Sequence, residues 1–293
     1  MAEKVYFTKD ISPESVIKMY ETVGKKLEGN VAVKVHSGEK GNQNFLRPEF
    51  WKPMIDTIGG RVVETNTNYG GARDNTKDHR ATISLHGWDR YFDVDIMDEE
   101  GDMAIPVPNG VQMKANLVGT HLANYDSMLV LAHFKGHPAA GYGGAIKQLS
   151  IGCASHEGKR IIHIGNMPNV ELWSDECFAN QTEFQRAMAD AACSVVNFFK
   201  GNIVYINVMK NISVDCDCCA VAEDPCMKDI GVLASTDPIA IDRACLDLIH
   251  KAVDDPGQAH FLERVNSRNG EYLIEAADAL GFGSSAYEFV NLD

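Results

Sequence analysis

Short hydrophobic runs alternate with amphipathic segments along the first half of the chain. Runs rich in β-branched residues are each followed by a segment whose apolar residues recur at helical spacing. The predicted strands are residues 5–7, 31–35, 61–64 and 128–131, and the predicted helices are residues 13–27, 47–58 and 75–85. Strands separated by helices in this order are typical of a largely parallel sheet.

The second half of the chain repeats the same rhythm. The predicted helices are residues 182–199, 238–253 and 270–280, and the predicted strands are residues 203–208, 230–234 and 286–290. No low-complexity segment, fixed repeat or linker interrupts the pattern. We therefore expect a single α/β domain over residues 1–293, with a mainly parallel sheet flanked by helices in Rossmann-like layers. Two lobes, about 1–130 and 131–293, around one cleft would fit the same pattern.

Polar and ionisable residues gather directly after four of the predicted strands. In open α/β sheets, ligands bind outside the carboxyl ends of the strands. After the strands at 31–35 and 61–64, the candidate substrate-binding residues are His36, Glu39, Asn66 and Arg73. A structural role, such as capping a helix or forming an ion pair, fits His36, Glu39 and Arg73 equally well.

The densest of these clusters runs from residue 133 to residue 147. It supplies four candidate catalytic residues: His133, Lys135, His137 and Lys147. Histidine suits proton transfer or metal ligation, and lysine can hold an anion or act as a base when it is desolvated. The intervening glycine and proline indicate a loop. The glycines before Lys147 would let backbone amides approach an anion, although the spacing is not that of a Walker A loop. A solvated cleft rim is the alternative.

A cysteine-rich loop follows the strand at 203–208. Cys216, Cys218, Cys219 and Cys226 are interleaved there with aspartates, and Cys153 ends the helix that begins near Lys147. Thiolates this close in sequence are soft ligands that favour zinc, iron or an iron–sulfur cluster. Asp215, Asp217 and Asp229 could instead bind a hard cation such as Mg or Ca. A redox disulfide and a loop with incidental cysteines are further alternatives.

Composition narrows the partners of the chain. It has 293 residues, eight cysteines and a formal net charge of −14. No basic cluster is present, which argues against nucleic acid as a partner. The first residues lack the features of a signal peptide, and no apolar run approaches the length of a membrane span. We expect a cytoplasmic protein with reduced thiols and no membrane contact.

Four long motifs resemble one protein family. They are VKVHSGEKGNQNFLRPEF, ETNTNYGGARDNTKDH, HFKGHPAAGYGGAIKQLSIGCAS and ISVDCDCC with the following DIGVLASTDPIAIDRACLDLI. Together they resemble the uncharacterized Fe-S centre proteins of anaerobic bacteria and archaea, also described as domain of unknown function 362. The resemblance implies an iron–sulfur cofactor. Many members carry a ferredoxin-like insert with C-x2-C-x2-C-x3-C-P motifs, whereas residues 160–183 of this chain contain only Cys177.

These observations together predict a metal- or iron–sulfur-dependent, redox-type enzyme of anaerobic metabolism. Its substrate would be a small anionic or carbonyl-bearing metabolite. The cofactor would be a 4Fe–4S cluster or a single zinc or iron ion at the cysteine loop, and flavin is not excluded. The alternatives are a metal-assisted lyase, isomerase or hydrolase without electron transfer, and a non-enzymatic carrier of a metal or cluster. A redox role would require an electron-transfer partner, and the sequence leaves a homodimer open.

Overall fold

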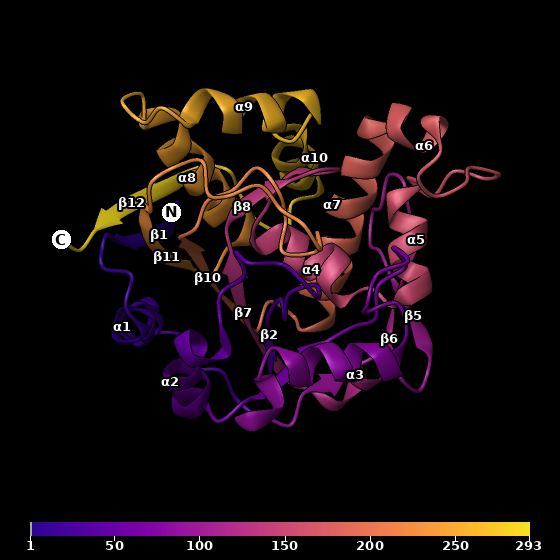
Figure 1. The fold of residues 1–293 in the computed structure, drawn as a ribbon, viewed down its shortest axis with the longest axis horizontal. Helices are drawn as coiled ribbons and strands as arrows, with labels where there is room; N and C mark the ends of the chain where they lie inside the picture. Colours follow the sequence, from indigo (N-terminus) through magenta and orange to yellow (C-terminus); the bar gives the residue numbers. More distant parts are fainter. Residues whose placement is uncertain (1) are drawn as a thin grey trace.

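One eight-stranded sheet organises the chain. In the computed structural model, which describes residues 2–293, the strand order is β12-β1-β11-β10-β7-β2-β3-β4. Within these residues, only β11 runs antiparallel to its neighbours in this sheet. The sheet takes strands from both halves of the chain, and helices lie on both of its faces (Figure 1). The expectation of a mainly parallel α/β fold is confirmed.

The strands and helices have the following bounds. The strands of the large sheet are β1 (Glu3–Thr8), β2 (Val31–Lys34), β3 (Arg61–Glu64), β4 (Asp95–Ile96), β7 (Ser127–His133), β10 (Ile203–Met209), β11 (Gly231–Ser235) and β12 (Tyr287–Asn291). Two hairpins pair β5 (Asp102–Pro106) with β6 (Ala115–Gly119) and β8 (Lys135–His137) with β9 (Gly141–Gly143). The helices are α1 (Pro13–Val23), α2 (Pro48–Ile58), α3 (Thr76–Leu85), α4 (Ala145–Cys153), α5 (His156–His163), α6 (Asp175–Ala179), α7 (Gln181–Phe198), α8 (Pro238–Lys251), α9 (Gln258–Ser267) and α10 (Tyr272–Leu280). Short 3-10 helices span Trp88–Arg90 and Thr120–Asn124.

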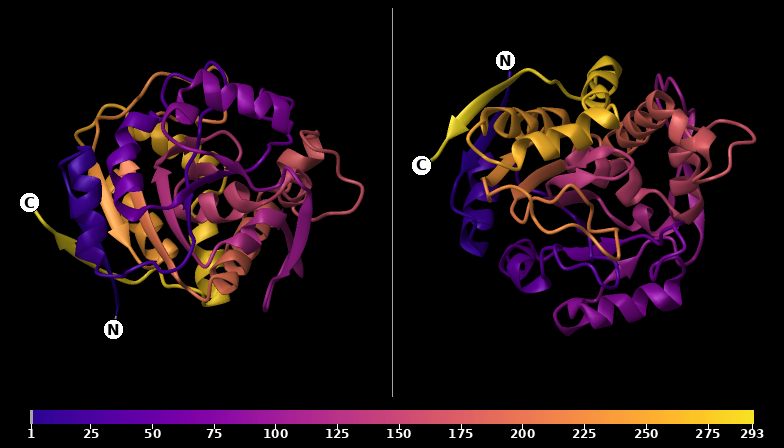
Figure 2. Two further views of the ribbon diagram at one scale, coloured as in Figure 1. Left: turned by 90° about the horizontal axis from the view of Figure 1, so that it is seen from below. Right: turned by 45° about the horizontal axis from the view of Figure 1, so that its top comes forward.

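The sheet is buried on both faces because successive residues of its strands enter two different cores. Leu129 and Leu131 of β7 pack with α1 and α2, whereas Met128 and Val130 pack with α4 and α8 on the other face. Helix α7 covers α4 and forms an outer layer with α10. The two chain ends lie at one edge of the sheet, where β1 pairs with β12 (Figure 2).

Two features of the chain differ from the sequence-based expectation. Residues 135–143 form the β8–β9 hairpin instead of an irregular loop, because Gly136 and Pro138 sit in an extended hairpin rather than interrupting a helix. The strand after the cysteine loop, β11, returns in the opposite direction to β10. The cysteine loop therefore begins and ends at the same edge of the sheet.

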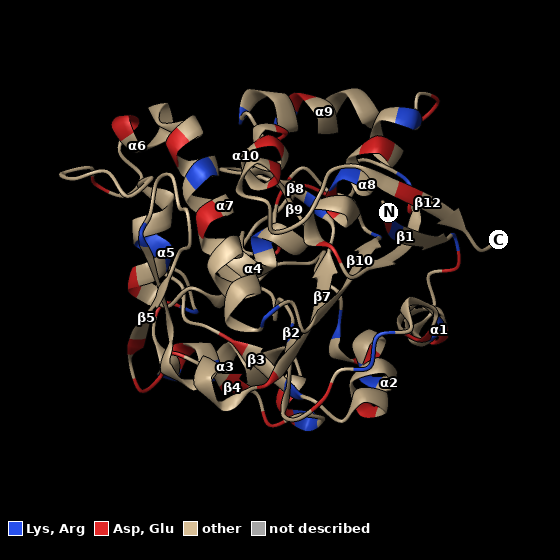
Figure 3. Ribbon diagram, turned by 180° about the vertical axis from the view of Figure 1, so that it is seen from behind, with Lys and Arg blue, Asp and Glu red and all other residues tan. Residues whose placement is uncertain are grey.

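Charged residues are dispersed over the outer helices. Basic and acidic positions both occur on α5, α7 and α9 in the view of Figure 3. None of the helices within residues 2–293 is long and apolar enough to cross a membrane.

The start of α4 is fixed by a carboxylate from α8. Asp242 accepts hydrogen bonds from the backbone N–H groups of Ala145 (2.7 Å) and Ile146 (3.0 Å) and from the Asn207 amide (2.7 Å). A Cβ atom on Gly144 would lie 2.3 Å from Asp242 Oδ1, so this approach requires glycine. Burial raises the pKa of Asp242 to about 6. The amides that the sequence analysis offered to an anionic ligand thus bind a side chain of the protein itself.

Replacing Asp242 by alanine is expected to destabilise the fold. Two N–H groups of α4 and the Asn207 amide would lose a buried partner, at a cost of about 3 kcal/mol in the free energy of unfolding. Urea denaturation at pH 7 measures this change. The control Asp56→Ala, at a half-exposed position of α2 that pairs with Lys52, should cost less than about 0.5 kcal/mol. Similar values for the two variants would contradict the role given to Asp242.

Candidate active site

A pocket lies at the carboxyl ends of β2 and β3, under the β8–β9 hairpin and α4. Its wall contains five cationic side chains, which come from four different elements and one loop. The residues that line it are Lys34, His36, Glu64, Thr65, Thr67, Tyr69, Arg73, Lys135, Gly143, Gly144, Lys147, Gln148, Ile151, Gly152, Lys159 and Cys218. The strand-end argument thus brought His36, Arg73, Lys135, Lys147 and Cys218 to one place.

Buried carboxylates hold three of the five cations. Lys34 pairs with Glu64 at 2.7 Å, and Lys135 pairs with Asp217 at 3.0 Å. Arg73 pairs with Glu39 at 3.1 Å and lies 3.7 Å from Glu64. Although burial raises the pKa of the Glu64 carboxyl, Lys34 and Arg73 outweigh it and hold that pKa at about 2. These pairs keep the wall charged and in place.

Two of the cations, Lys147 and Lys159, have no carboxylate partner within residues 2–293. The Lys147 side chain also makes no hydrogen bond there. The Lys159 Nζ donates to the Thr65 hydroxyl and to the Ala154 carbonyl, the latter at 2.7 Å. Burial lowers the pKa of Lys159 to about 7. The wall therefore has an excess of positive charge in a strongly acidic protein, which favours an anionic ligand.

Lys34 and Lys159 were missed by the sequence analysis. Lys34 is the last residue of β2 and Lys159 lies in α5, a helix that was not predicted. The strand-end rule pointed to residues after each strand, whereas Lys34 lies within a strand. A lysine in an otherwise apolar strand is the signal that could have found it, since such residues are seldom buried without a partner.

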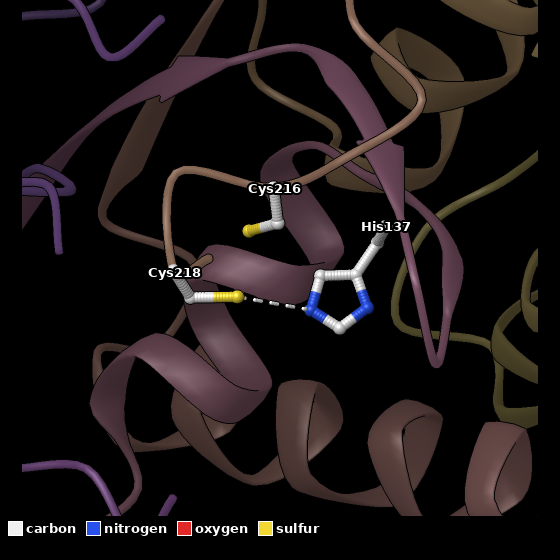
Figure 4. Close-up of side chains that lie close together, drawn as sticks. All are labelled: His137, Cys216 and Cys218. Atoms are coloured by element: carbon white, nitrogen blue, oxygen red, sulfur yellow. Dashed lines mark hydrogen bonds between the residues drawn. The ribbon is translucent and has the colours of Figure 1, made fainter. Parts of the chain in front are cut away.

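Cys216 and Cys218 face His137 across the end of the sheet (Figure 4). One ligand atom from each of the three residues lies within 4.8 Å of the other two, so this group could hold a metal ion. The hairpin reaches the cysteine loop because Gly136 donates to the Ser213 carbonyl at 2.7 Å. A Cβ atom at Gly136 would lie 2.3 Å from the Val214 carbonyl oxygen, so only glycine permits this contact.

The ring of His137 is oriented by backbone N–H groups. Its Nδ1 accepts from Ala139 at 3.1 Å and Ala140 at 2.9 Å, and its Nε2 lies 3.5 Å from Cys218 Sγ. Burial lowers the pKa of His137 to about 3. The ring is therefore neutral near pH 7, with its proton on Nε2, and it would have to release that proton to ligate a metal.

The three thiols of the loop share hydrogen bonds. The Cys218 thiol interacts with Cys216, which lowers its pKa, but the bond with Cys219 and burial together raise it to about 11. The same bond from Cys218 lowers the pKa of Cys219. The Asn42 amide donates to the Cys216 and Cys219 carbonyls, at 3.2 and 2.9 Å, and so shapes the turn.

The other two candidate metal ligands lie elsewhere. The Cys153 thiol bonds to the Gln148 carbonyl, and burial raises its pKa to about 11. The Cys226 thiol bonds to the Ile212 carbonyl. Neither belongs to the group of His137, Cys216 and Cys218. A 4Fe–4S cluster with four thiolate ligands therefore does not fit this arrangement, whereas a single ion fits its donor set.

His133 supports the loop. Its Nδ1 lies 3.0 Å from Asp217 and its Nε2 lies 2.5 Å from the Lys210 carbonyl, so both ring nitrogens face acceptors. Neither nitrogen is free to accept a proton from a ligand. His133 is absent from the pocket wall.

The four candidate substrate-binding residues are divided by the structure. His36 and Arg73 line the pocket, and Glu39 holds Arg73 from behind. Asn66 is used within the protein, where its amide bonds to Thr76 and its carbonyl oxygen faces His79. Its backbone N–H donates to Asp98 at 2.9 Å.

The fold and the site define an α/β protein with a group of metal-type ligands beside a cation-lined pocket. Residues 31–247 match the family described as Domain of unknown function (DUF362). The chain belongs to this family, which confirms the resemblance seen in its motifs. The family description names no cofactor and no reaction.

Comparisons with other proteins give only distant likenesses. No curated protein matches the chain. The structure of the lactate racemase apoprotein from Thermoanaerobacterium thermosaccharolyticum is 14% identical with a TM-score of 0.41, over 70% of this chain and 50% of that one. A protein from Thermotoga maritima is 10% identical with a TM-score of 0.38, over 93% of this chain and 59% of that one. The chain spans about half the length of the racemase structure.

Lys159 gives the wild-type protein a distinct pH dependence of stability. Its folded-state pKa of about 7 lies below the usual 10.5, so the unfolded chain binds more protons between these values. This residue's contribution to stability therefore improves as the pH rises from 7 to 10.5. We expect any advantage of Lys159→Met over wild type to shrink across this window, by up to about 1.4 kcal/mol per pH unit.

Urea titrations of both proteins at several pH values between 7 and 10 measure this difference. Lys159→Arg is the matched control, because arginine stays charged over the whole window. A constant difference between wild type and Lys159→Met would show that Lys159 keeps an ordinary pKa.

Proposed function

We propose that the protein is a metal-dependent enzyme that acts on a small anionic metabolite. One observation carries the proposal: Cys218 belongs both to the group of metal-type ligands and to the wall of the cation-lined pocket. A ligand held by the lysines would therefore lie beside the thiols. Such proximity of a metal site and a charged pocket is typical of catalytic sites.

The donor set favours a single zinc or iron ion over a cluster. Two thiolates and one imidazole are the ligands of some catalytic zinc sites, which keep a fourth position open. Cys216 and Cys218 would hold the ion, and His137 would join them after losing its Nε2 proton. When bound, the ion would supply Lewis-acid polarisation of a substrate oxygen. This favours the lyase, isomerase or hydrolase alternative over a reaction with electron transfer.

The residues of the pocket have separate roles in this proposal. Lys147, which lacks an internal partner, would bind the charge of the substrate. His36 is oriented by the Gly38 N–H on its Nδ1 at 3.1 Å. Burial and the nearby cations lower the pKa of His36 well below its usual value, so the neutral ring would donate from Nε2. Lys159, with a pKa of about 7, would accept a proton from the substrate.

Metal analysis tests the proposal. Protein purified without oxygen is expected to carry about one zinc or iron ion per chain and no acid-labile sulfide. Cys218→Ser and Cys216→Ser should lose that ion, since thiolate is a far better ligand for it than a hydroxyl. Cys226→Ser is the matched control, because its thiol lies outside the group.

Two outcomes would contradict the proposal. Stoichiometric sulfide that depends on Cys226 would indicate a cluster. Equal metal content in wild type, Cys216→Ser and Cys218→Ser would show that the thiols hold no ion.

A further inference from the structure

Three buried polar atoms in the pocket wall have no hydrogen-bond partner within residues 2–293. They are Thr67 Oγ1, Arg73 Nη2 and Gln148 Nε2. Their residues are 2%, 2% and 6% exposed, so bulk water does not replace the missing partners. Native proteins rarely leave buried polar atoms unpaired, and their gathering in one pocket indicates a ligand.

The surroundings fix these atoms in place. Arg73 uses Nε for Glu39 and turns Nη1 toward Glu64, which leaves Nη2 as its free donor. The backbone N–H of Thr67 donates to the Arg73 carbonyl at 2.8 Å, which ties the two residues together. Gln148 lies one turn into α4, whose start is held by Asp242. The unpaired atoms therefore belong to rigid elements, as a specific binding site requires.

The chemistry of these atoms defines the ligand. A guanidinium N–H, an amide N–H and a hydroxyl all donate hydrogen bonds, so the ligand must offer several acceptor oxygens. Glu64, the one carboxylate of the pocket wall, is already paired with Lys34 and lies near Arg73, which disfavours a cation. A compact oxyanion satisfies both conditions.

We propose that Thr67, Arg73 and Gln148 bind the oxyanion group of the substrate, a carboxylate or a phosphate, on the wall of the pocket. The inference rests on the proposed function, since it names the group by which that substrate is recognised. Thr67 and Gln148 are new to the site and determine its specificity. Arg73 supplies the charge.

The unpaired state of these atoms gives a test with opposite signs for binding and stability. Thr67→Val and Gln148→Leu remove a donor that has no internal partner. We expect each to weaken binding of the oxyanion about tenfold. Neither should lower the denaturation midpoint of the free protein, because an unpaired polar atom has been replaced by an apolar one.

Isothermal titration of the purified full chain with acetate, oxalate and inorganic phosphate as probes measures the binding. Tighter binding of acetate or oxalate would identify a carboxylate site, and tighter binding of phosphate a phosphate site. Thr82→Val and Gln185→Leu are the matched controls, because these side chains are buried and hydrogen-bonded outside the pocket. They should lower the denaturation midpoint and leave oxyanion binding unchanged.

The outcomes separate this inference from the proposed function. Wild-type affinity in Thr67→Val and Gln148→Leu, with weaker binding in Lys147→Met, would overturn the subsite and leave the proposed function standing. A lowered denaturation midpoint with unchanged binding in Thr67→Val and Gln148→Leu would show that the two residues are structural. Failure of wild type to bind any of the three probes would overturn both proposals.

Discussion

The arrangement of the site depends on the buried carboxylate of Asp217. It accepts from His133 of β7 and pairs with Lys135 of β8, so it joins the sheet, the hairpin and the cysteine loop at one point. Its backbone carbonyl also accepts the N–H of Glu39 at 2.8 Å, which brings in the loop after β2. Although burial opposes ionisation, His133 and Lys135 hold the pKa of Asp217 far below its usual range. Because Asp217 stands between Cys216 and Cys218 in sequence, anchoring it also positions both thiols.

A second set of buried pairs makes the pocket positive without making the fold unstable. Burying a lysine or an arginine alone is costly, and each carboxylate behind the wall offsets part of that cost. Glu64 lies against both Lys34 and Arg73, so the charges are shared among neighbours. The carboxylates face the protein while the unused donors face the pocket. An acidic protein thereby presents a cationic site, which restricts attraction of anions to that place.

Part of this arrangement could be predicted from the sequence. The alternation of strands and helices gave the mainly parallel sheet, and the rule for strand ends placed Lys135, Lys147 and Cys218 near one another. Local patterns could not reveal that α5 brings Lys159 to the pocket, because that contact depends on how the β5–β6 hairpin and α5 pack. The same limit applies to Cys153 and Cys226. Their spacing along the chain suggested shared ligation, but the separation of their thiols follows from the path of α4 and of the loop before β11.

The aspartates of the cysteine loop explain why sulfur, rather than oxygen, supplies the ligands of the proposed metal site. Sequence alone left open a hard cation at Asp215, Asp217 and Asp229. Asp215 pairs with Arg264 at 3.0 Å, and Asp229 pairs with Lys210 at 2.9 Å. With Asp217 held by Lys135, each of these carboxylates already has a cation of the protein as its partner. A metal ion would have to displace those partners to bind oxygen, whereas the thiols of Cys216 and Cys218 have only each other, Cys219 and His137 as neighbours in their hydrogen bonds. The loop therefore uses its acidic residues for folding and leaves its soft ligands for chemistry.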